Sequence, residues 1–219
     1  MCETVERVVR FYTHQKDGVA FKQKVSPLLN KRDALKYRAF SNFYREQGFL
    51  FVYKGETWED SETAFQYYRW LRHAPSGGAP LEEEYGAFLQ NIQYAATPAK
   101  ALFLSRFVSY RKRDGVAYCS SPFPQFQWYA DLVMEAYATG IRRPEMDDAA
   151  DYQLMHDLVE CKFEQNPSLM ALLKSTGSAK IAEHTTRDRK WGDGGDGSGT
   201  NWLGKILVAV RDKSNHTDE

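Results

Sequence analysis

A stripe of polar side chains marks one face of a helix that the sequence predicts for residues 57–73. Glu62, Gln66, Arg69 and His73 fall at positions i, i+4, i+7 and i+11, so their side chains project from the same side of that helix. A carboxylate can act as an acid or a base, and a guanidinium can hold a phosphate. The stripe is therefore the first candidate for a site that does chemistry.

Two interpretations of this stripe are open. Ala64, Tyr68 and Leu71 share the opposite face, which is the usual pattern of a helix whose polar side faces solvent. The stripe is also flanked by Trp58 and Phe65, and rings of this size rarely border fully hydrated charge. The flanking rings favour a cleft over an ordinary solvent-facing side.

A second candidate is the glycine-rich segment RDRKWGDGGDGSGTNWLGK at 187–205. It contains G-x-G-x-x-G, but more loop follows the last glycine instead of a helix, and Asp193 and Asp196 would repel a pyrophosphate. The skeleton G-x-x-x-x-G-K that begins at Gly199 is followed by Ile206, which has no hydroxyl for magnesium. Calcium-loop patterns are also absent. The segment is therefore none of the common phosphate or calcium loops.

The composition describes a globular protein with no strong charge bias. The chain has 219 residues, is 42% hydrophobic and carries a formal net charge of +0, so one domain with a substantial core is expected, without global attraction to nucleic acid or membrane. Cys2, Cys119 and Cys161 follow no metal or redox spacing, which predicts free thiols in a reducing compartment. With no apolar signal core or membrane span, we expect an intracellular protein, in the cytoplasm or the nucleus.

The predicted elements are mostly helices. Thr57 and Asp60 are spaced like a capping box at the start of the helix that carries the polar stripe. Further helices are expected at 80–96, 97–109, 146–163 and from Pro167 to just before Gly177. Strands are expected at 5–13, 48–55 and 180–186. Residues 202–211 fit a helix or a strand, because periodicity alone does not decide between them.

Six blocks in fixed order resemble the NADAR family, also called YbiA-like. The resemblance covers about residues 38–211 and rests on SNFY (41–44), WEDSETAFQ (58–66), KFEQN (162–166), LLKSTG (172–177), DRKWG (188–192) and GTNWLG (199–204). It implies a mainly helical α+β fold in a single domain with short strands. Known members are N-glycosidases: some hydrolyse early intermediates of the riboflavin pathway, and others remove ADP-ribose from modified guanine. We thus expect a strand-rich extension at 1–37, an N-glycosidase domain at 38–213 and a disordered tail at 214–219.

The resemblance also implies a set of site residues. The catalytic set is Glu62 as the carboxylate, Asp188 as a second anchor or base, and Arg69. The substrate-binding set is Ser41, Asn42, Phe43, Trp58, Gln66, Lys162, Trp191, Gly192, Gly199 and Asn201. No metal and no cofactor is expected, since the histidines are scattered.

Several of these residues have a specific expected role, and some have an alternative. Gly192 and Gly199 would let backbone amides approach a phosphate or ribose, and Asn201 would hydrogen-bond a sugar hydroxyl. Trp191 would stack on the ligand or simply pack in the core. Lys162 would be a pocket cation or a charge on the helix surface.

The sequence departs from the family at two places. Family members often have a lysine where this chain has Arg69, and arginine stays protonated, so it cannot form an imine. Members also commonly carry a tryptophan before the helix that ends in lysine and phenylalanine. Here Met146 is nearby, and Trp128 lies in a longer segment that does not clearly replace that tryptophan.

Three functions are compatible with this pattern. The first is hydrolysis of ADP-ribosylated guanine, free or in nucleic acid, for which Arg69 and the basic turn at 111–115 would suit a diphosphate or a strand. The second is hydrolysis of ribosylaminopyrimidine phosphates of the riboflavin pathway. The third is a module that binds ADP-ribose or a related nucleotide without turnover. We expect the first, with an ADP-ribose-containing nucleotide or ADP-ribosylated nucleic acid as partner and a monomeric protein that does not bind membranes.

Overall fold

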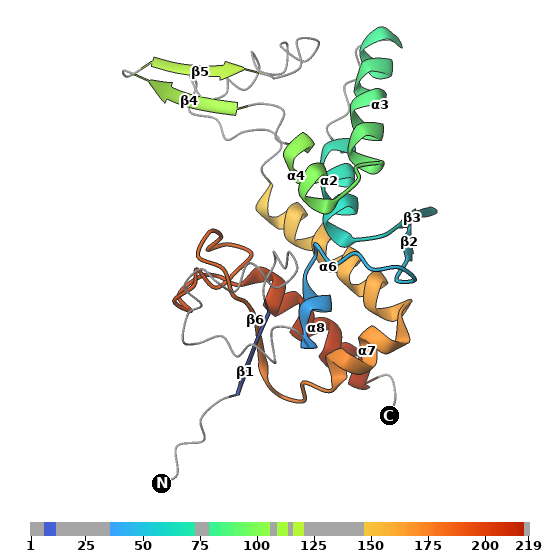
Figure 1. Cartoon of the computed structure of the whole chain (residues 1–219), viewed down its shortest axis with the longest axis vertical. Helices are drawn as coiled ribbons and strands as arrows, with labels where there is room; N and C mark the ends of the chain where they lie inside the picture. Colours follow the sequence, from blue (N-terminus) through green and yellow to red (C-terminus); the bar gives the residue numbers. More distant parts are fainter. Residues whose placement is uncertain are drawn as a thin grey trace. The chain divides into compact units, whose positions relative to one another are not determined.

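The computed structural model of the chain describes residues 7–11, 36–72, 79–105, 109–113, 116–120 and 147–216 (Figure 1). The chain forms two compact units, one of Met1–Ser61 with Met155–Glu219 and one of Glu62–Leu154. Both boundaries between the units fall inside helices. The sequence predicts one domain, and no linker composition marks a division at these places.

In the described residues, the first unit contains one parallel strand pair, one hairpin, a short 3₁₀ helix, two complete α-helices and the larger part of a third. Its elements are β1 (Val8–Phe11), the 3₁₀ helix η2 (Arg38–Phe40), β2 (Phe51–Tyr53), β3 (Glu56–Trp58), α7 (Pro167–Lys174), β6 (Lys180–Glu183) and α8 (Trp202–His216). Strand β1 runs parallel to β6, with Val9 opposite Ile181. A strand of the predicted extension at 1–37 thus pairs with a strand of the predicted domain.

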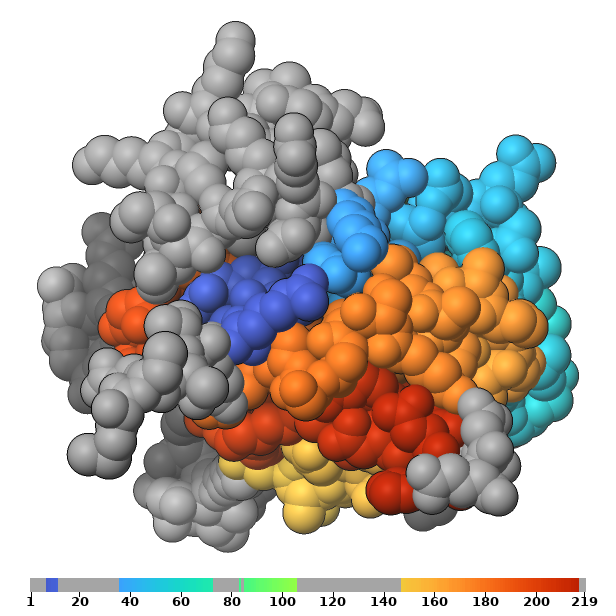
Figure 2. Space-filling view, turned by 90° about the horizontal axis from the view of Figure 1, so that it is seen from below, coloured from blue at the N-terminus to red at the C-terminus, as the bar shows by residue number. Residues whose placement is uncertain are grey.

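Helix α8 packs against β6 and α7. Figure 2 shows the blue of β1 and the light blue of residues from 36 onward on the same face as the orange of α7 and the red of α8. The structure thus decides that residues 202–211 are helical. The helix continues to His216, so the prediction of disorder from residue 214 is wrong for 214–216; residues 217–219 lie outside the described part.

The hairpin β2–β3 explains why the predicted capping box is wrong. Its two-residue turn has positive φ at Lys54 (50°) and Gly55 (85°), as a type I′ turn requires. Thr57 lies in β3 opposite Val52, so it cannot cap a helix. The helix that carries the polar stripe, α2, instead begins at Ser61 and ends at Leu71.

The core of the first unit is built around aromatic rings. The ring of Phe40 lies 5.1 to 5.9 Å, centroid to centroid, from those of Tyr37, Phe11 and Phe163. Phe40 belongs to η2 and Tyr37 directly precedes it, while Phe11 comes from β1 and Phe163 from helix α6 (Asp148–Glu164). Phe163 is fully buried.

The second unit is a group of helices with a hairpin. Besides most of α2 and the first turns of α6, it contains α3 (Ala79–Gln93), α4 (Pro98–Ser105), β4 (Ser109–Arg113) and β5 (Val116–Ser120). Tyr85 donates a hydrogen bond of 2.7 Å to the Trp70 carbonyl, and the rings of both pack on Phe88. The helix predicted for 97–109 ends at Ser105, and Ser109 already belongs to β4. Most of the basic turn at 111–115 continues β4, and residues 114 and 115 lie outside the described part.

The remaining helix signals are confirmed. Pro167 begins α7, and Gly177 follows its end with a φ of 59°, the left-handed conformation typical of a helix C-terminus. Asp147 accepts a hydrogen bond from the Ala150 amide at the start of α6. The mainly helical α+β architecture with short strands is the one that the sequence predicts.

Candidate functional site

The polar stripe of α2 is buried at its N-terminal end. Glu62 and Gln66 are 4% and 3% exposed, which excludes the interpretation of a solvent-facing side for these two residues. The Gln66 Nε2 atom donates a hydrogen bond of 2.8 Å to Glu62 Oε1. Because Glu62 lies in the first turn of α2, the positive end of the helix dipole stabilises its negative charge.

Farther along the stripe, α2 carries cations that are already paired. Arg69 and Arg72 both form ion pairs with Asp151 of α6, the first at 3.5 Å between Nε and Oδ2. Two guanidinium groups thus share one carboxylate. His73, the last member of the stripe, lies outside the described residues, as do Met146 and Trp128.

Asp60, which directly precedes α2, anchors the beginning of that helix. Its carboxylate is fully buried and accepts hydrogen bonds of 2.8 and 2.6 Å from Arg45 Nε and Nη2. The next residue, Ser61, donates from its hydroxyl to the Asn42 carbonyl at 3.4 Å. Arg45 and Asp60 were not among the predicted site residues, although a carboxylate just before a helix was a visible signal.

The SNFY segment forms a tight turn that Lys162 fastens to α6. The Lys162 amine donates hydrogen bonds of 2.9 Å to the carbonyls of Ala39 and Ser41. The Ser41 hydroxyl accepts one from the Phe43 amide at 3.1 Å. Ser41, Asn42 and Lys162 are all buried, and Phe43 is half-buried. Trp58 is buried too and ends strand β3.

Lys162 is neither an exposed helix charge nor an accessible cation. Burial lowers its pKa to about 7, and the Asp60 carboxylate only partly opposes this shift. A neutral amine has two N–H groups, and the two carbonyls are enough to satisfy them. The sequence shows a lysine in a helix but not that its amine is buried.

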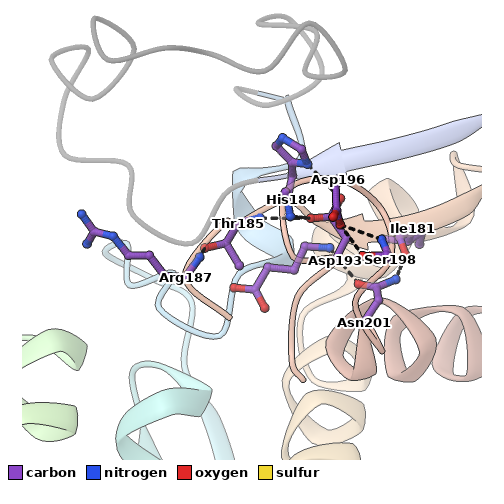
Figure 3. A network of polar contacts seen from close by, with 10 residues as sticks. Ile181, His184, Thr185, Arg187, Asp193, Asp196, Ser198 and Asn201 are labelled. Atoms are coloured by element: carbon purple, nitrogen blue, oxygen red, sulfur yellow. Dashed lines mark hydrogen bonds and ion pairs between the residues drawn. The ribbon is translucent and has the colours of Figure 1, made fainter. Parts of the chain in front are cut away.

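Asp193 organises the glycine-rich loop (Figure 3). Its carboxylate accepts hydrogen bonds from the amides of Thr185 and Gly195, at 3.2 and 2.8 Å, and from His184 Nδ1 at 2.8 Å. Its backbone amide donates to the Glu183 carbonyl, and its own carbonyl accepts from two loop amides. His184 and Asp193 are both buried. This pair was not predicted, since nine residues separate its members and neither follows a known motif.

Gly192 and Gly199 are required by the close packing of the loop on itself. A Cβ on Gly192 would lie 2.4 Å from Thr185 Cγ2, and one on Gly199 would lie 2.5 Å from the Gly192 carbonyl oxygen. The absence of a Cβ at these two positions therefore allows segments of the loop to pack closely against one another. Hydrogen bonds from Ser198 also lower the pKa of the exposed Asp196 to about 2, and Arg189 lies 3.5 Å from its carboxylate.

Asp188 and Asn201 use their side chains to hold this loop. Asp188 Oδ1 accepts hydrogen bonds of 2.8 Å from the amides of Lys190 and Trp191. Asn201, with a φ of 54°, accepts from the Glu183 amide and donates to the Ile181 carbonyl, which fastens the loop end to β6. The structure thus gives Asn201 a structural role where a bond to a sugar hydroxyl was expected.

Trp191 is half-buried and therefore is not a simple core residue. Its ring stands perpendicular to that of Trp202, with 5.2 Å between the centroids. The Lys190 amine lies 4.5 Å from the centre of the Trp202 ring. The Trp191 ring is thus partly accessible, and its stacking on a ligand stays a prediction.

The predicted residues thus form local groups. Glu62 and Gln66 are in contact on α2; Ser41, Asn42 and Lys162 are joined around the SNFY turn; and Asp188, Trp191, Gly192, Gly199 and Asn201 build the loop. Within the described residues, no group of three histidine, cysteine or carboxylate side chains is placed to hold a metal ion. Nor is any helix in the described ranges long and apolar enough to span a membrane.

Comparison with known proteins finds one matching domain family and several named relatives. Residues 28–214 match the NADAR domain. A stretch of 61 residues is 48% identical to N-glycosidase YbiA of Shigella boydii and of Escherichia coli, which covers 28% of this chain and 38% of each relative. A stretch of 61 residues is 46% identical to a riboflavin biosynthesis protein of Vibrio vulnificus and covers 17% of it. The aligned part therefore spans well under half the length of these relatives.

The fold has a counterpart of known structure. The NMR structure of the Escherichia coli protein YbiA matches 97% of this chain and 88% of its own, with a TM-score of 0.54 and 24% sequence identity. This likeness shows a shared fold.

Proposed function

The chain belongs to the NADAR domain family, and from this premise we propose that it is an N-glycosidase that cleaves the bond between ribose and a base nitrogen in a nucleotide. The stretch of 48% identity to proteins named N-glycosidase YbiA supports this activity. The observation that carries the proposal is the buried Glu62 carboxylate, held by Gln66 in the first turn of α2.

A carboxylate in this setting suits the chemistry of the bond. When C1′ and the base nitrogen separate, the electron pair leaves with the base, which takes up a proton, while water adds to C1′ and loses a proton. Positive charge develops on the ribose in the transition state. Glu62 can stabilise that charge or take the proton from water, and such a group typically contributes about a hundred- to ten-thousandfold in rate.

We assign Arg69 to anion binding. Where family members often have a lysine amine, this chain has a guanidinium that stays protonated and holds a phosphate in a two-pronged fashion. The ion pair with Asp151 holds this guanidinium in place beside α6. Asp188 acts through the loop: it fixes the turn that presents Trp191.

For the substrate, we propose ADP-ribosylated guanine, as a free nucleotide or in nucleic acid. The guanidinium of Arg69 is suited to the diphosphate of such a molecule. A second candidate, a ribosylaminopyrimidine phosphate, is favoured by the riboflavin biosynthesis protein among the relatives. Both substrates contain the same ribose–nitrogen bond.

One assay separates these possibilities. ADP-ribosyl-guanosine and a ribosylaminopyrimidine phosphate are incubated side by side with wild type and with Glu83→Gln, an exposed control on α3, and the products are separated by liquid chromatography. Release of guanosine with ADP-ribose supports the first substrate, and release of the free aminopyrimidine supports the second. If folded protein binds ADP-ribose but converts neither compound, the chain is a nucleotide-binding module and the proposed activity is wrong.

A further inference from the structure

The orientation of the Gln66 side-chain amide is fixed by its neighbour. An ionised carboxylate can only accept hydrogen bonds, so the amide must turn its Nε2 atom toward Glu62, at 2.8 Å from Oε1. The Oε1 atom of Gln66 then necessarily points away from Glu62. The rotated amide would place two acceptor oxygens against each other.

This orientation leaves a buried acceptor. Gln66 Oε1 is inaccessible to solvent and has no hydrogen-bond partner among the described residues. Leaving such a group unsatisfied in the interior of a protein is unfavourable, and buried polar atoms of this kind are few. A ligand that brings a hydrogen-bond donor would remove this deficit.

We propose that Gln66 Oε1 accepts a hydrogen bond from the 2-hydroxyl of the ribose whose C1 is attacked. This inference rests on the proposed function, since it places that C1 beside Glu62. The 2-hydroxyl is on the carbon next to C1. The Gln66 amide carries both the Nε2 atom that donates to Glu62 and the free Oε1 atom, so a contact with the 2-hydroxyl would lie next to the contact with Glu62. In glycoside hydrolysis, hydrogen bonds at the 2-hydroxyl strengthen in the transition state. Gln66 thereby selects ribose over 2-deoxyribose and orients Glu62 at the same time.

The test compares two sugar phosphates that differ only in this hydroxyl. Ribose 5-phosphate and 2-deoxyribose 5-phosphate are titrated by calorimetry into wild type, Gln66→Met and Gln66→Lys. Methionine removes both contacts, whereas lysine keeps a donor for Glu62 and removes only the acceptor. Gln90→Met, an exposed glutamine on α3, is the matched control.

We expect wild type and Gln90→Met to bind ribose 5-phosphate at least about fivefold more tightly than the deoxy sugar, the lower end of what a satisfied buried acceptor contributes. In both Gln66 variants the ratio should fall close to one. An unchanged ratio in a folded Gln66 variant, or no preference in wild type, would overturn the inference.

The outcome is separable from that of the proposed function. If the nucleotides are hydrolysed but the ratio does not depend on Gln66, the activity stands and the role of Gln66 is wrong. If neither nucleotide is hydrolysed but the affinity ratio behaves as expected, Gln66 binds the 2-hydroxyl in a protein that binds the nucleotide without cleaving it. If neither sugar phosphate binds wild type at millimolar concentration, the role of Gln66 is also wrong.

Discussion

Replacing Lys162 by methionine should change how the stability of the protein depends on pH. Burial lowers the pKa of this amine in the folded state to about 7, whereas in the unfolded chain it is near 10.5. Between these two values the unfolded chain holds one proton more than the folded protein. Raising the pH through this window therefore favours the folded state.

The magnitude follows from the single proton. One proton gives a slope of at most about 1.4 kcal/mol per pH unit in the free energy of unfolding. Below pH 7 both states are charged, and the folded state carries the full cost of the buried ammonium. Lys162→Met removes this dependence and also leaves the carbonyls of Ala39 and Ser41 without their donor, a cost that does not vary with pH.

Urea unfolding at intervals from pH 7 to 10 measures the effect. The free energy of unfolding of wild type should rise relative to that of Lys162→Met across this range, by a few kcal/mol in all. Lys205→Met, which replaces an exposed lysine of α8, should follow wild type. Parallel curves for wild type and Lys162→Met would refute the assignment of a buried, neutral amine.

Three other substitutions test the loop and α2. Asp193→Asn removes the charge that His184 and two amides contact, so urea unfolding should show a loss of about 1.5–3 kcal/mol; unchanged stability would contradict the central position of Asp193. Gly199→Ala places a methyl group 2.5 Å from a backbone oxygen and should lower stability by about 1–3 kcal/mol, whereas Gly86→Ala, with open space around it, should not; equal effects would exclude a packing role. Arg69→Lys should weaken nucleotide binding more than turnover in steady-state kinetics, because a point charge replaces a two-pronged group. A rise in turnover would show that a lysine amine at this position is the better catalyst and that the role of Arg69 is not limited to anion binding.

Helix signals in the sequence were reliable where they act locally. The proline that begins α7 and the glycine that follows it specify backbone angles by themselves, and both are found as predicted. The cap at Thr57 was wrong because pairing of β3 with β2 overrides the local signal. Helix α8 could not be assigned from periodicity, since both of its possible states place apolar residues inside.

The site was predictable by residue type but not by environment. The blocks of the family resemblance selected Glu62 and Gln66, yet their pattern equally fits a solvent-facing stripe, and only the structure shows that they are buried. The pairs His184–Asp193 and Arg45–Asp60 join positions 9 and 15 residues apart, and no periodicity links them. Contacts of this kind arise from the tertiary fold, so a single sequence carries little trace of them.

The most direct measurement is the single-turnover rate of Glu62→Gln with whichever nucleotide the wild type hydrolyses. Glutamine keeps the shape of the side chain and removes its charge, so the variant should bind the product as wild type does and cleave the ribose–nitrogen bond at least about a hundredfold more slowly. Equal rates for the two proteins, with the fold intact by circular dichroism, would contradict the role of Glu62 as the catalytic carboxylate.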